Sequence, residues 1–289
     1  MENLELEFIK MQVTGNDYIY IDGFHKNIDI EFIKPYIRYM CDRNFGIGSD
    51  GVIFVVPSEV ALAKMIMYNK DGTEANMCGN GICSVAKYLY ENKLTTQKEF
   101  QIETKAGVKN VTLNENLGNV ESVSVNMGYP KFNPKLVPVI TEKSFFLNES
   151  IIIGNENYRT TCVSMGNPHA VVLTKHIKNL KIYKIGPEFE AHYLFPERTN
   201  VEFIEKVDEK NIKMRIWERG SGETLSCGSG ACASVAAAVM TGELSKNTKI
   251  QVIQKGGTLE VEYNDQEGMI LTGTTEKVYE GKILLKKKD

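Results

Sequence analysis

The chain of 289 residues has few of the features that mark secreted, membrane-spanning or nucleic-acid-binding proteins. Its first segment, Met1–Gln12, carries acidic residues where a secretion signal needs basic ones, and no apolar core follows it. No hydrophobic run is as long as a membrane span. Lysine and arginine are scattered and the formal net charge is −3, so a basic surface for nucleic acid is not expected. We therefore expect a cytoplasmic protein that binds neither a membrane nor nucleic acid.

Cysteine is also scarce, because six residues in a chain of this length are too few for a disulfide framework. In a reducing compartment they are expected to be free thiols, each either buried in the core or used in chemistry. The spacing Cys-x-x-x-x-Cys is unusual for zinc and no histidine follows at ligand distance, so no metal is expected. A Cys-x-x-Cys redox motif is absent as well.

What the sequence does contain is a series of short β-rich segments, many of them bounded by glycine, asparagine or aspartate. A glycine and several prolines at 127–138 predict a linker between two halves. Apolar residues recur with helical spacing at Asp29–Asp42, Ile82–Tyr90 and Gly230–Met240. Strands are predicted at 8–11, 18–21, 52–56, 65–68, 100–104, 108–113, 120–127, 150–153, 160–164, 170–173, 201–204, 213–217, 249–252, 258–263 and 269–272.

Two short segments, one in each half, are near copies of each other. Cys78–Cys83 reads CGNGIC and Cys227–Cys232 reads CGSGAC, and each runs directly into a predicted helix. Each half is therefore mostly strands around one prominent helix that starts at a Cys-Gly-x-Gly motif. This pattern predicts an α+β fold of two structurally related domains, each a mostly antiparallel sheet wrapped around a central helix.

A cysteine at the mouth of a helix is well placed for acid/base chemistry. The free N–H groups and partial positive charge of a helix N-terminus favour the reactive thiolate and can also hold a carboxylate. Cys78 and Cys227 should experience this field, whereas Cys83 and Cys232 should face the core. If both helix ends hold one carboxylate, its α-carbon lies between two thiols. One thiol can then take the α-proton while the other donates.

Other interpretations of the two cysteine motifs give them no acid/base role in racemisation. A single cysteine before a helix is most often a small buried residue, and a cysteine hydrolase needs a histidine base, for which only His169 lies in a motif-like setting. A thiol–disulfide redox protein or a non-catalytic amino-acid-binding module would not need two activated thiols. The duplication of the motif favours the acid/base interpretation. Polar segments that could bind an amino acid lie at 14–17, 68–72, 164–169, 198–200 and 218–224.

Taken together, the motifs resemble those of the bacterial and plant diaminopimelate epimerases, which are two-cysteine enzymes that need no pyridoxal phosphate. The resemblance spans nearly the whole chain. Two departures concern Gly51, where many members have glutamine, and Gln12–Thr14, where His-Gly-Leu is commoner; neither removes a catalytic residue. The matching motifs are Lys10–Met11, Gly15–Asp17, Phe45–Gly51, Asn69–Glu74, Met77–Gly81, Gly166–His169, Asn200, Glu218–Gly220, Gly222–Thr224 and Cys227–Gly230.

The resemblance implies a fold and a set of functional residues. It implies domains at 1–128 and 129–275, a last strand at 276–289 that returns to the first domain, and an active site in the cleft between the domains. By this resemblance Cys78 and Cys227 are the acid/base pair and His169 supports them. The implied substrate-binding residues are Asn16, Asn69, Gly79, Asn80, Asn167, Asn200, Glu218, Arg219, Gly228 and Ser229.

The implied reaction is conversion of L,L-diaminopimelate to meso-diaminopimelate for lysine and peptidoglycan precursors, without a cofactor. The expected partners are a small amino-acid substrate and a second copy of the chain, in a homodimer. Relatives with the same cysteine pair racemise other amino acids, histidine among them, which keeps a different racemase as the alternative. Retention of Arg219 and of the three asparagines Asn69, Asn167 and Asn200 favours a substrate with a second amino-acid end.

Overall fold

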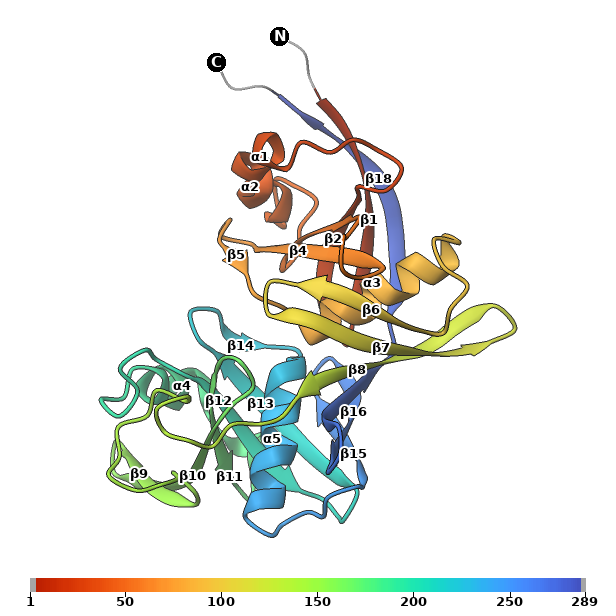
Figure 1. The fold of residues 1–289 in the computed structure, drawn as a ribbon. Coiled ribbons are helices and arrows are strands. Elements are labelled where there is room, and N and C mark those ends of the chain that lie inside the picture. Colours follow the sequence, from red (N-terminus) through yellow and green to blue (C-terminus); the bar gives the residue numbers. More distant parts are fainter. Residues whose placement is uncertain (1–3, 287–289) are drawn as a thin grey trace. The chain divides into compact units, whose positions relative to one another are not determined.

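A computed structural model describes residues 4–286 of the chain. Contacts divide it into two compact units, of which unit 1 runs to Val125 and resumes at Gly273, and unit 2 is Asn126–Thr272 (Figure 1). The sequence predicts boundaries after residues 128 and 275, and the division in the structure falls after residues 125 and 272. The first and last three residues of the predicted domain at 1–128 and 276–289 lie outside the described residues.

Unit 1 is built from strands that surround one long helix. Strand β1 pairs antiparallel with both β18 and β2, and β2 lies parallel to β3. From β3 the pairing continues through β4 to β5 and β6, and then through β7 to β8. The strands are β1 Leu4–Val13, β2 Asn16–Asp22, β3 Gly51–Val56, β4 Ala63–Asn69, β5 Glu74–Ala75, β6 Glu99–Thr104, β7 Gly107–Asn116, β8 Asn119–Gly128 and β18 Glu276–Leu285.

Unit 2 repeats this order of pairings. Strand β10 pairs antiparallel with β9 and β11, and β11 lies parallel to β12. From β12 the pairing continues through β13 to β14 and β15, and then through β16 to β17. The strands are β9 Glu149–Ile153, β10 Glu156–Ser164, β11 Pro168–Leu173, β12 Asn200–Lys206, β13 Asn211–Glu218, β14 Gly222–Thr224, β15 Lys249–Gln254, β16 Gly257–Asn264 and β17 Gly268–Gly273.

The registers make the two units equivalent residue by residue. Tyr18 lies opposite Gly51 on the parallel pair β2–β3, as His169 lies opposite Asn200 on β11–β12. Ile53 pairs with Met67 in unit 1, and Glu202 pairs with Ile216 in unit 2. The distance along the chain from Ile53 to Cys78 equals that from Glu202 to Cys227. The predicted fold class, α+β with two related domains, is confirmed.

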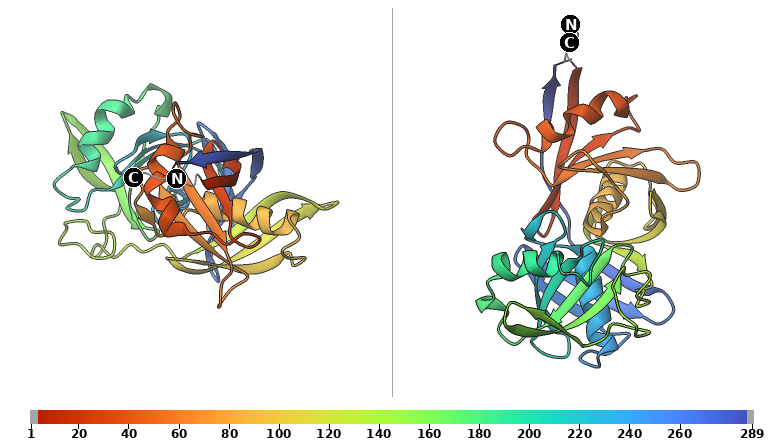
Figure 2. Two further views of the ribbon diagram at one scale, coloured as in Figure 1. Left: turned by 90° about the horizontal axis from the view of Figure 1, so that it is seen from above. Right: turned by 90° about the vertical axis from the view of Figure 1, so that its left-hand side faces the viewer.

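Each unit is centred on one helix of equal length, α3 Gly79–Glu91 and α5 Gly228–Met240. Both helices are buried along most of their length, and α5 contacts strands β10, β11, β12, β13 and β16 (Figure 2). Its small residues, alanine above all, allow strands to approach it closely from several sides. The structure therefore confirms the prediction of a sheet wrapped around a central helix.

Two helical regions differ from the sequence prediction. The predicted helix at 29–42 is divided into α1 Ile30–Ile33, the 3₁₀ segment η1 Lys34–Tyr36 and α2 Ile37–Cys41, because Pro35 has no N–H to donate. Unit 2 has a helix that was not predicted, α4 Ile182–Glu190, and a 3₁₀ turn, η2 Ile177–Asn179. Neither region contains a predicted site residue.

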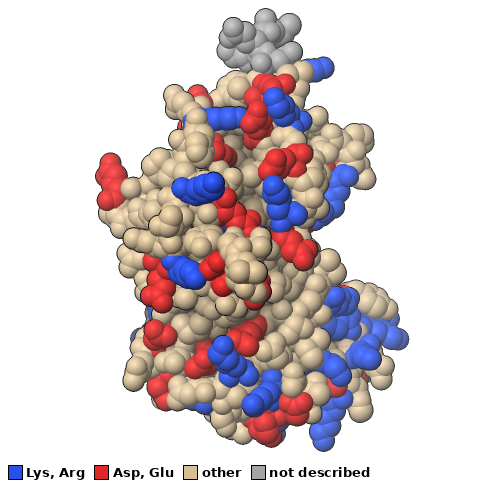
Figure 3. Space-filling view, turned by 90° about the vertical axis from the view of Figure 1, so that its right-hand side faces the viewer, with Lys and Arg blue, Asp and Glu red and all other residues tan. Residues whose placement is uncertain are grey.

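Charged side chains of both signs are mixed on the surface. Figure 3 shows side chains of both signs on one face of the protein. Exposed pairs such as Lys246–Asp265 and Lys282–Glu5 are 2.8 Å apart. Such exposed pairs contribute about 0–1 kcal/mol each, so they favour solubility over stability. No helix among residues 4–286 has the length and apolar character to cross a bilayer.

Candidate active site

In unit 1 the candidate residues lie at the N-terminus of α3, where Cys78 is the N-cap residue. Its backbone is extended, and its sulfur accepts a hydrogen bond from the Gly81 N–H at 3.4 Å. Gly79 and Asn80, the first two residues of the helix, are buried. A capping sulfur at the positive end of a helix is stabilised as an anion, and the neighbouring N–H groups lack partners within the helix. The structure thus places Cys78 as the sequence predicts.

Two side chains from β2 contact the sulfur of Cys78. The buried Tyr18 hydroxyl lies 3.5 Å from Cys78 Sγ and donates to it, and the thiol lies 3.6 Å from Asn16 Oδ1. Asn80 Nδ2 donates to the same oxygen of Asn16 at 3.3 Å. Asn16 and Tyr18 lie two residues apart on one face of the strand, which directs both toward the helix N-terminus. Asn16, Cys78 and Asn80 are therefore brought together as predicted.

A network of charged residues behind Asn16 fixes the orientation of its amide. Asn16 Nδ2 donates to Asp50 Oδ2 at 2.8 Å, which turns Asn16 Oδ1 toward the thiol. Arg43 contacts both Asp50 and Asp17, at 3.0 and 2.7 Å. Burial opposes ionisation of Asp17, but Arg43 and Lys10 outweigh it and lower the pKa of this carboxyl. The network keeps the carboxyl group of Asp17 charged beside Asn16.

In unit 2 the candidate residues lie at the N-terminus of α5, where Cys227 is the N-cap residue with the same extended backbone. Its sulfur accepts from the Gly230 N–H at 3.4 Å and lies 3.4 Å from Ser229 Oγ. The backbone N–H of Cys227 donates to Gln254 Oε1 at 2.9 Å. Gly228 is buried and Ser229 is half-buried, so the predicted residues of this motif also lie together.

The surroundings of Cys227 favour the protonated thiol. Burial raises the pKa of Cys227 well above the usual value, and the nearby carboxyl groups of Glu218 and Glu202 raise it further. The Ser229 hydroxyl and the Gly230 N–H act in the opposite direction without overcoming these effects. Burial first, and the carboxyl groups of Glu218 and Glu202 second, therefore act against the field of the helix N-terminus at Cys227.

Beside α5, a chain of three polar side chains runs from the loop before β11 into the core. Asn167 Oδ1 lies 3.0 Å from His169 Nε2, and His169 Nδ1 lies 2.6 Å from Glu202 Oε1. The side chains of His169 and Glu202 are fully buried. His169 therefore links Asn167 to Glu202, and its supporting role in the reaction stays a prediction.

The remaining predicted residues lie on loops at strand ends. Asn200 is buried, donates to Pro168 O at 3.0 Å and accepts from the Arg219 N–H at 2.9 Å, so its amide holds two loops together. Arg219 is exposed, and its guanidinium donates to Glu197 O. Glu218 Oε1 accepts from the Thr224 hydroxyl. In unit 1, Asn69 Nδ2 donates to Thr73 Oγ1 within its own turn at 3.1 Å.

The other four cysteines are buried free thiols. Burial raises the pKa of Cys83 to about 12 and also raises the pKa of Cys41 and Cys162. These four thiols are buried, which separates them from the two half-buried capping cysteines Cys78 and Cys227.

Sequence reasoning missed three residues that contact the site. Tyr18 carries a signal in the sequence, because it lies two positions after Asn16 on the same strand face. Glu202 also carries one, since it is an acidic residue within the apolar run Val201–Ile204. Gln254 lies at the end of β15 and is distant in sequence from Cys227, so nothing local to Cys227 indicates it.

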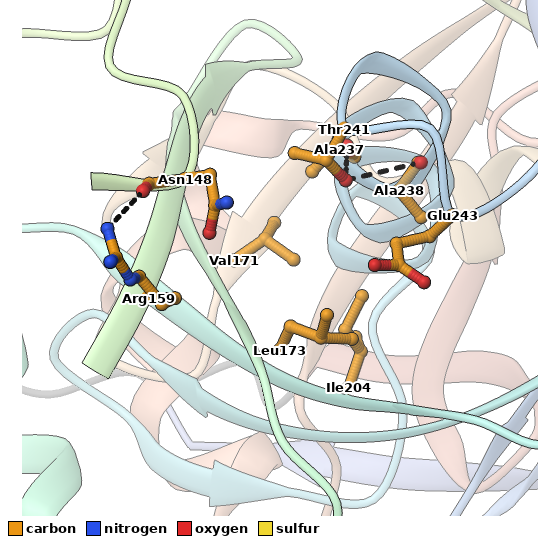
Figure 4. Close-up of a pocket in the computed structure, with 9 residues that line it drawn as sticks. All are labelled: Asn148, Arg159, Val171, Leu173, Ile204, Ala237, Ala238, Thr241 and Glu243. Atoms are coloured by element: carbon orange, nitrogen blue, oxygen red, sulfur yellow. Dashed lines mark hydrogen bonds between the residues drawn. The ribbon is translucent and has the colours of Figure 1, made fainter. Parts of the chain in front are cut away.

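A pocket in unit 2 lies away from this chemistry. It is at the C-terminal end of α5, around Ala237, Ala238 and Thr241, whereas Cys227 caps the opposite end (Figure 4). A helix of 13 residues is about 20 Å long. The pocket is therefore separate from the candidate site. Its other lining residues are Asn148, Arg159, Val171, Leu173, Ile204 and Glu243.

Comparison with known proteins gives the family. The model of the family described as diaminopimelate epimerase matches residues 8–133 and 161–279. A diaminopimelate epimerase of Methanococcus maripaludis strain C5 is 43% identical over 279 residues, which cover 96% of this chain and 99% of the relative. One from Acetivibrio thermocellus is 42% identical, with 96% and 98% covered.

Solved structures share the fold at low sequence identity. A PhzF-family phenazine biosynthesis protein from Bacillus anthracis superposes with a TM-score of 0.69 at 18% identity, covering 98% of this chain and 100% of that chain. A hydroxyproline epimerase from Agrobacterium vitis gives 0.68 at 14% identity, with 97% and 93% covered. These structures show the fold alone, two related domains, whereas the family model and the relatives at 42–43% identity define the class, an isomerase. The chain belongs to the diaminopimelate epimerase family.

Proposed function

We propose that the protein interconverts L,L-diaminopimelate and meso-diaminopimelate without a cofactor, with Cys78 and Cys227 as its two acid/base groups. The observation that carries the proposal is the repeated geometry of the two thiols. Each caps the central helix of its unit and accepts a hydrogen bond from the glycine N–H three residues later, at 3.4 Å in both units. An enzyme that inverts a carbon needs one group that removes a proton and a second that returns one to the other face.

The two thiols begin the reaction in different states in this proposal. Cys227 starts as a thiol, because burial and the carboxyl groups of Glu218 and Glu202 raise its pKa. Cys78 is the base in this proposal: the Tyr18 hydroxyl and the Gly81 N–H donate to its sulfur and stabilise the thiolate, which forms at the expense of the contact between the thiol and Asn16 Oδ1. In the direction from the L,L isomer, Cys78 takes the α-proton and Cys227 donates its own. The roles reverse for the meso isomer.

The helix ends supply the electrostatic stabilisation. As the α-proton leaves, negative charge develops on the substrate carboxylate, and free N–H groups at a helix N-terminus are positioned donors for that charge. Gly79 and Asn80 in one unit, and Gly228 and Ser229 in the other, occupy these positions. In this proposal Asn69, Asn167, Asn200 and Arg219 bind the distal amino-acid end of the substrate.

Proton exchange with solvent tests the reaction and the substrate together. The reduced protein in D₂O should introduce deuterium at the α-carbon of L,L-diaminopimelate, and NMR should show the meso isomer appearing. L-histidine, L-lysine, L-proline and L-glutamate serve as parallel substrates. Uptake into one of these instead of diaminopimelate would favour a different racemase on the same two cysteines. Absence of uptake into all of them would overturn the proposal.

Single cysteine variants test the two-base scheme. Cys78→Ser and Cys227→Ser should each remove nearly all conversion between isomers, because one face of the carbon then lacks its acid/base group. A variant that keeps one working thiol can still exchange the α-proton on a single face without inversion. Full activity of either variant would contradict the scheme.

The proposal also gives the protein a place in metabolism. We propose that its product supplies lysine and peptidoglycan precursor synthesis, in keeping with the family. A bacterial strain that lacks its own diaminopimelate epimerase should grow without added diaminopimelate when it carries this chain. The Cys78→Ser variant is the matched control and should not restore growth.

A further inference from the structure

The fully buried Glu202 lies where the fold itself requires no charged residue. Its equivalent in unit 1 is Ile53, which is also fully buried and also lies against the second glycine of the cysteine motif. A Cβ atom added to Gly81 would meet Ile53 Cδ1 at 2.8 Å, and one added to Gly230 would meet Glu202 Oε1 at 2.8 Å. The same position beneath the same helix is therefore filled by an apolar side chain in one unit and by a carboxyl group in the other.

Burial of the Glu202 carboxyl group costs folding free energy. Among residues 4–286, Glu202 Oε2 is buried without a hydrogen-bond partner. Leaving a buried polar atom without a partner costs about 1–3 kcal/mol. Natural proteins accept such costs mainly at functional sites. The other oxygen of the carboxyl group, Oε1, lies 2.6 Å from Nδ1 of His169.

The protonation of the pair decides what His169 does for Asn167. Asn167 presents its carbonyl oxygen to His169 Nε2 at 3.0 Å, and an oxygen without hydrogen can only accept, so Nε2 carries the proton between them. Glu202 then faces Nδ1 either as a neutral acid that donates to it or as the carboxylate of an ion pair with a doubly protonated ring. Burial, which raises the pKa of Glu202, favours the neutral acid.

We propose that Glu202 is a positioning residue that holds His169 with its Nε2 protonated, and so keeps the Asn167 amide turned with its NH₂ group free to donate to a substrate carboxylate. The inference rests on the proposed function for the identity of that carboxylate, which belongs to the distal amino-acid end of the substrate. Without Glu202 the ring can protonate at Nδ1 instead. Nε2 then accepts, and the amide of Asn167 reverses and presents an oxygen to the carboxylate.

Two variants separate this role from a packing role. Glu202→Gln can still donate to His169 Nδ1 and should keep KM within about twofold of the wild type. Glu202→Ile introduces the residue that unit 1 uses at the same position. It should raise KM for diaminopimelate about tenfold while changing kcat much less, because Asn167 contributes binding in the ground state and transition state alike.

The isoleucine variant removes a buried oxygen that has no partner, but it also leaves Nδ1 of the buried His169 without one. Thermal unfolding therefore serves to check that the variant is folded at the assay temperature. A purely structural role predicts losses in both kinetic constants, whereas a positioning role predicts a higher KM with kcat changed much less. Wild-type KM in Glu202→Ile would overturn the proposal.

NMR of the ring nitrogens provides a readout that does not depend on activity. The chain has four histidines, so ¹⁵N-labelled histidine gives few signals, and a His169→Gln variant assigns the one that matters. We expect Nε2 of His169 to be protonated in the wild type and in Glu202→Gln, and the tautomer to change in Glu202→Ile. A wild-type ring protonated only at Nδ1 would overturn the role of Glu202, whereas absence of α-proton exchange in the wild type would overturn the proposed function instead.

Discussion

Among single residues, Tyr18 bears most directly on the proposed chemistry, because its hydroxyl group contacts the sulfur of Cys78. It lies 3.5 Å from Cys78 Sγ and is buried, and a donor at that distance stabilises a thiolate. Tyr18→Phe should slow alkylation of Cys78 by iodoacetamide at neutral pH and lower kcat/KM about tenfold. Mass spectrometry that locates the modified cysteine measures the first effect.

The matched control for Tyr18→Phe is available on the same strand. Tyr20 is buried two residues further along β2, and its hydroxyl donates to the backbone oxygen of Gly81 and not to the sulfur. Tyr20→Phe should therefore leave Cys78 alkylation close to the wild-type rate. Equal effects of the two substitutions would show that the hydroxyl of Tyr18 does not act on the thiol.

Alkylation of Cys227 should depend on pH in a different way from that of an exposed thiol. Because its pKa is raised well above 9.0, the thiol stays protonated through neutral pH and becomes reactive only at high pH. Glu218→Gln removes a negative neighbour, which lowers the pKa and should speed alkylation of Cys227 at any fixed pH below it. The measurement is the pH profile of Cys227 modification in both proteins. An unchanged profile in the variant would contradict this assignment of cause.

At the scale of single elements, the two cysteines are helix caps as well as reactive groups. Serine is a preferred N-cap residue, whereas alanine at an N-cap costs about 1 kcal/mol. Cys78→Ser and Cys227→Ser should therefore keep the free energy of unfolding near that of the wild type, while Cys78→Ala and Cys227→Ala should each lower it by about 1 kcal/mol. Urea unfolding of the four variants measures the difference. Equal losses in the serine and alanine variants would argue against a capping role.

The elements that sequence reasoning predicts best are those whose signal is local. The strands of both units follow from β-rich runs, and the helices α3 and α5 follow from the cysteine–glycine motifs that open them. Helix α4 was missed because Gly186–Pro187 predicts a turn. A Cβ at residue 186 would lie 2.5 Å from the Trp217 ring, so the glycine is needed for a contact distant in sequence.

The residues of the candidate site also differ in whether a local sequence signal predicts them. Cys78, Cys227 and the residues beside them in sequence are predictable, because a motif places them at a helix N-terminus. The raised pKa of Cys227 is not predictable from the sequence, because Glu218 and Glu202 come from strands β13 and β12 and approach the thiol only in the folded unit. Electrostatic properties depend on distances between elements, and a linear motif does not contain those distances.

At the scale of the whole molecule, unit 1 is discontinuous in sequence and unit 2 is continuous. Strand β18 pairs with β1 along nearly its full length, and Leu285 is fully buried in the same core cluster as Leu6 and Phe8 (Figure 1). Thr275, at the entry to β18, lies 2.6 Å from the Ser84 hydroxyl on α3. Burial of Leu285 alone contributes about 2 kcal/mol, in addition to the hydrogen bonds between the strands.

A chain that ends at Gly273 should therefore lose the stability of unit 1 and keep that of unit 2. The single tryptophan, Trp217, reports on unit 2 alone, where its ring N–H donates to Glu190 at 2.7 Å. Its fluorescence transition in urea should move little between the shortened and the full-length chain. Hydrogen exchange should instead show that β1–β4 lose protection, because β1 has become an unpaired edge and its core has lost Leu285. A shortened chain whose tryptophan transition disappears would mean that unit 2 also depends on the returning strand, although its own sheet is complete between Asn126 and Thr272.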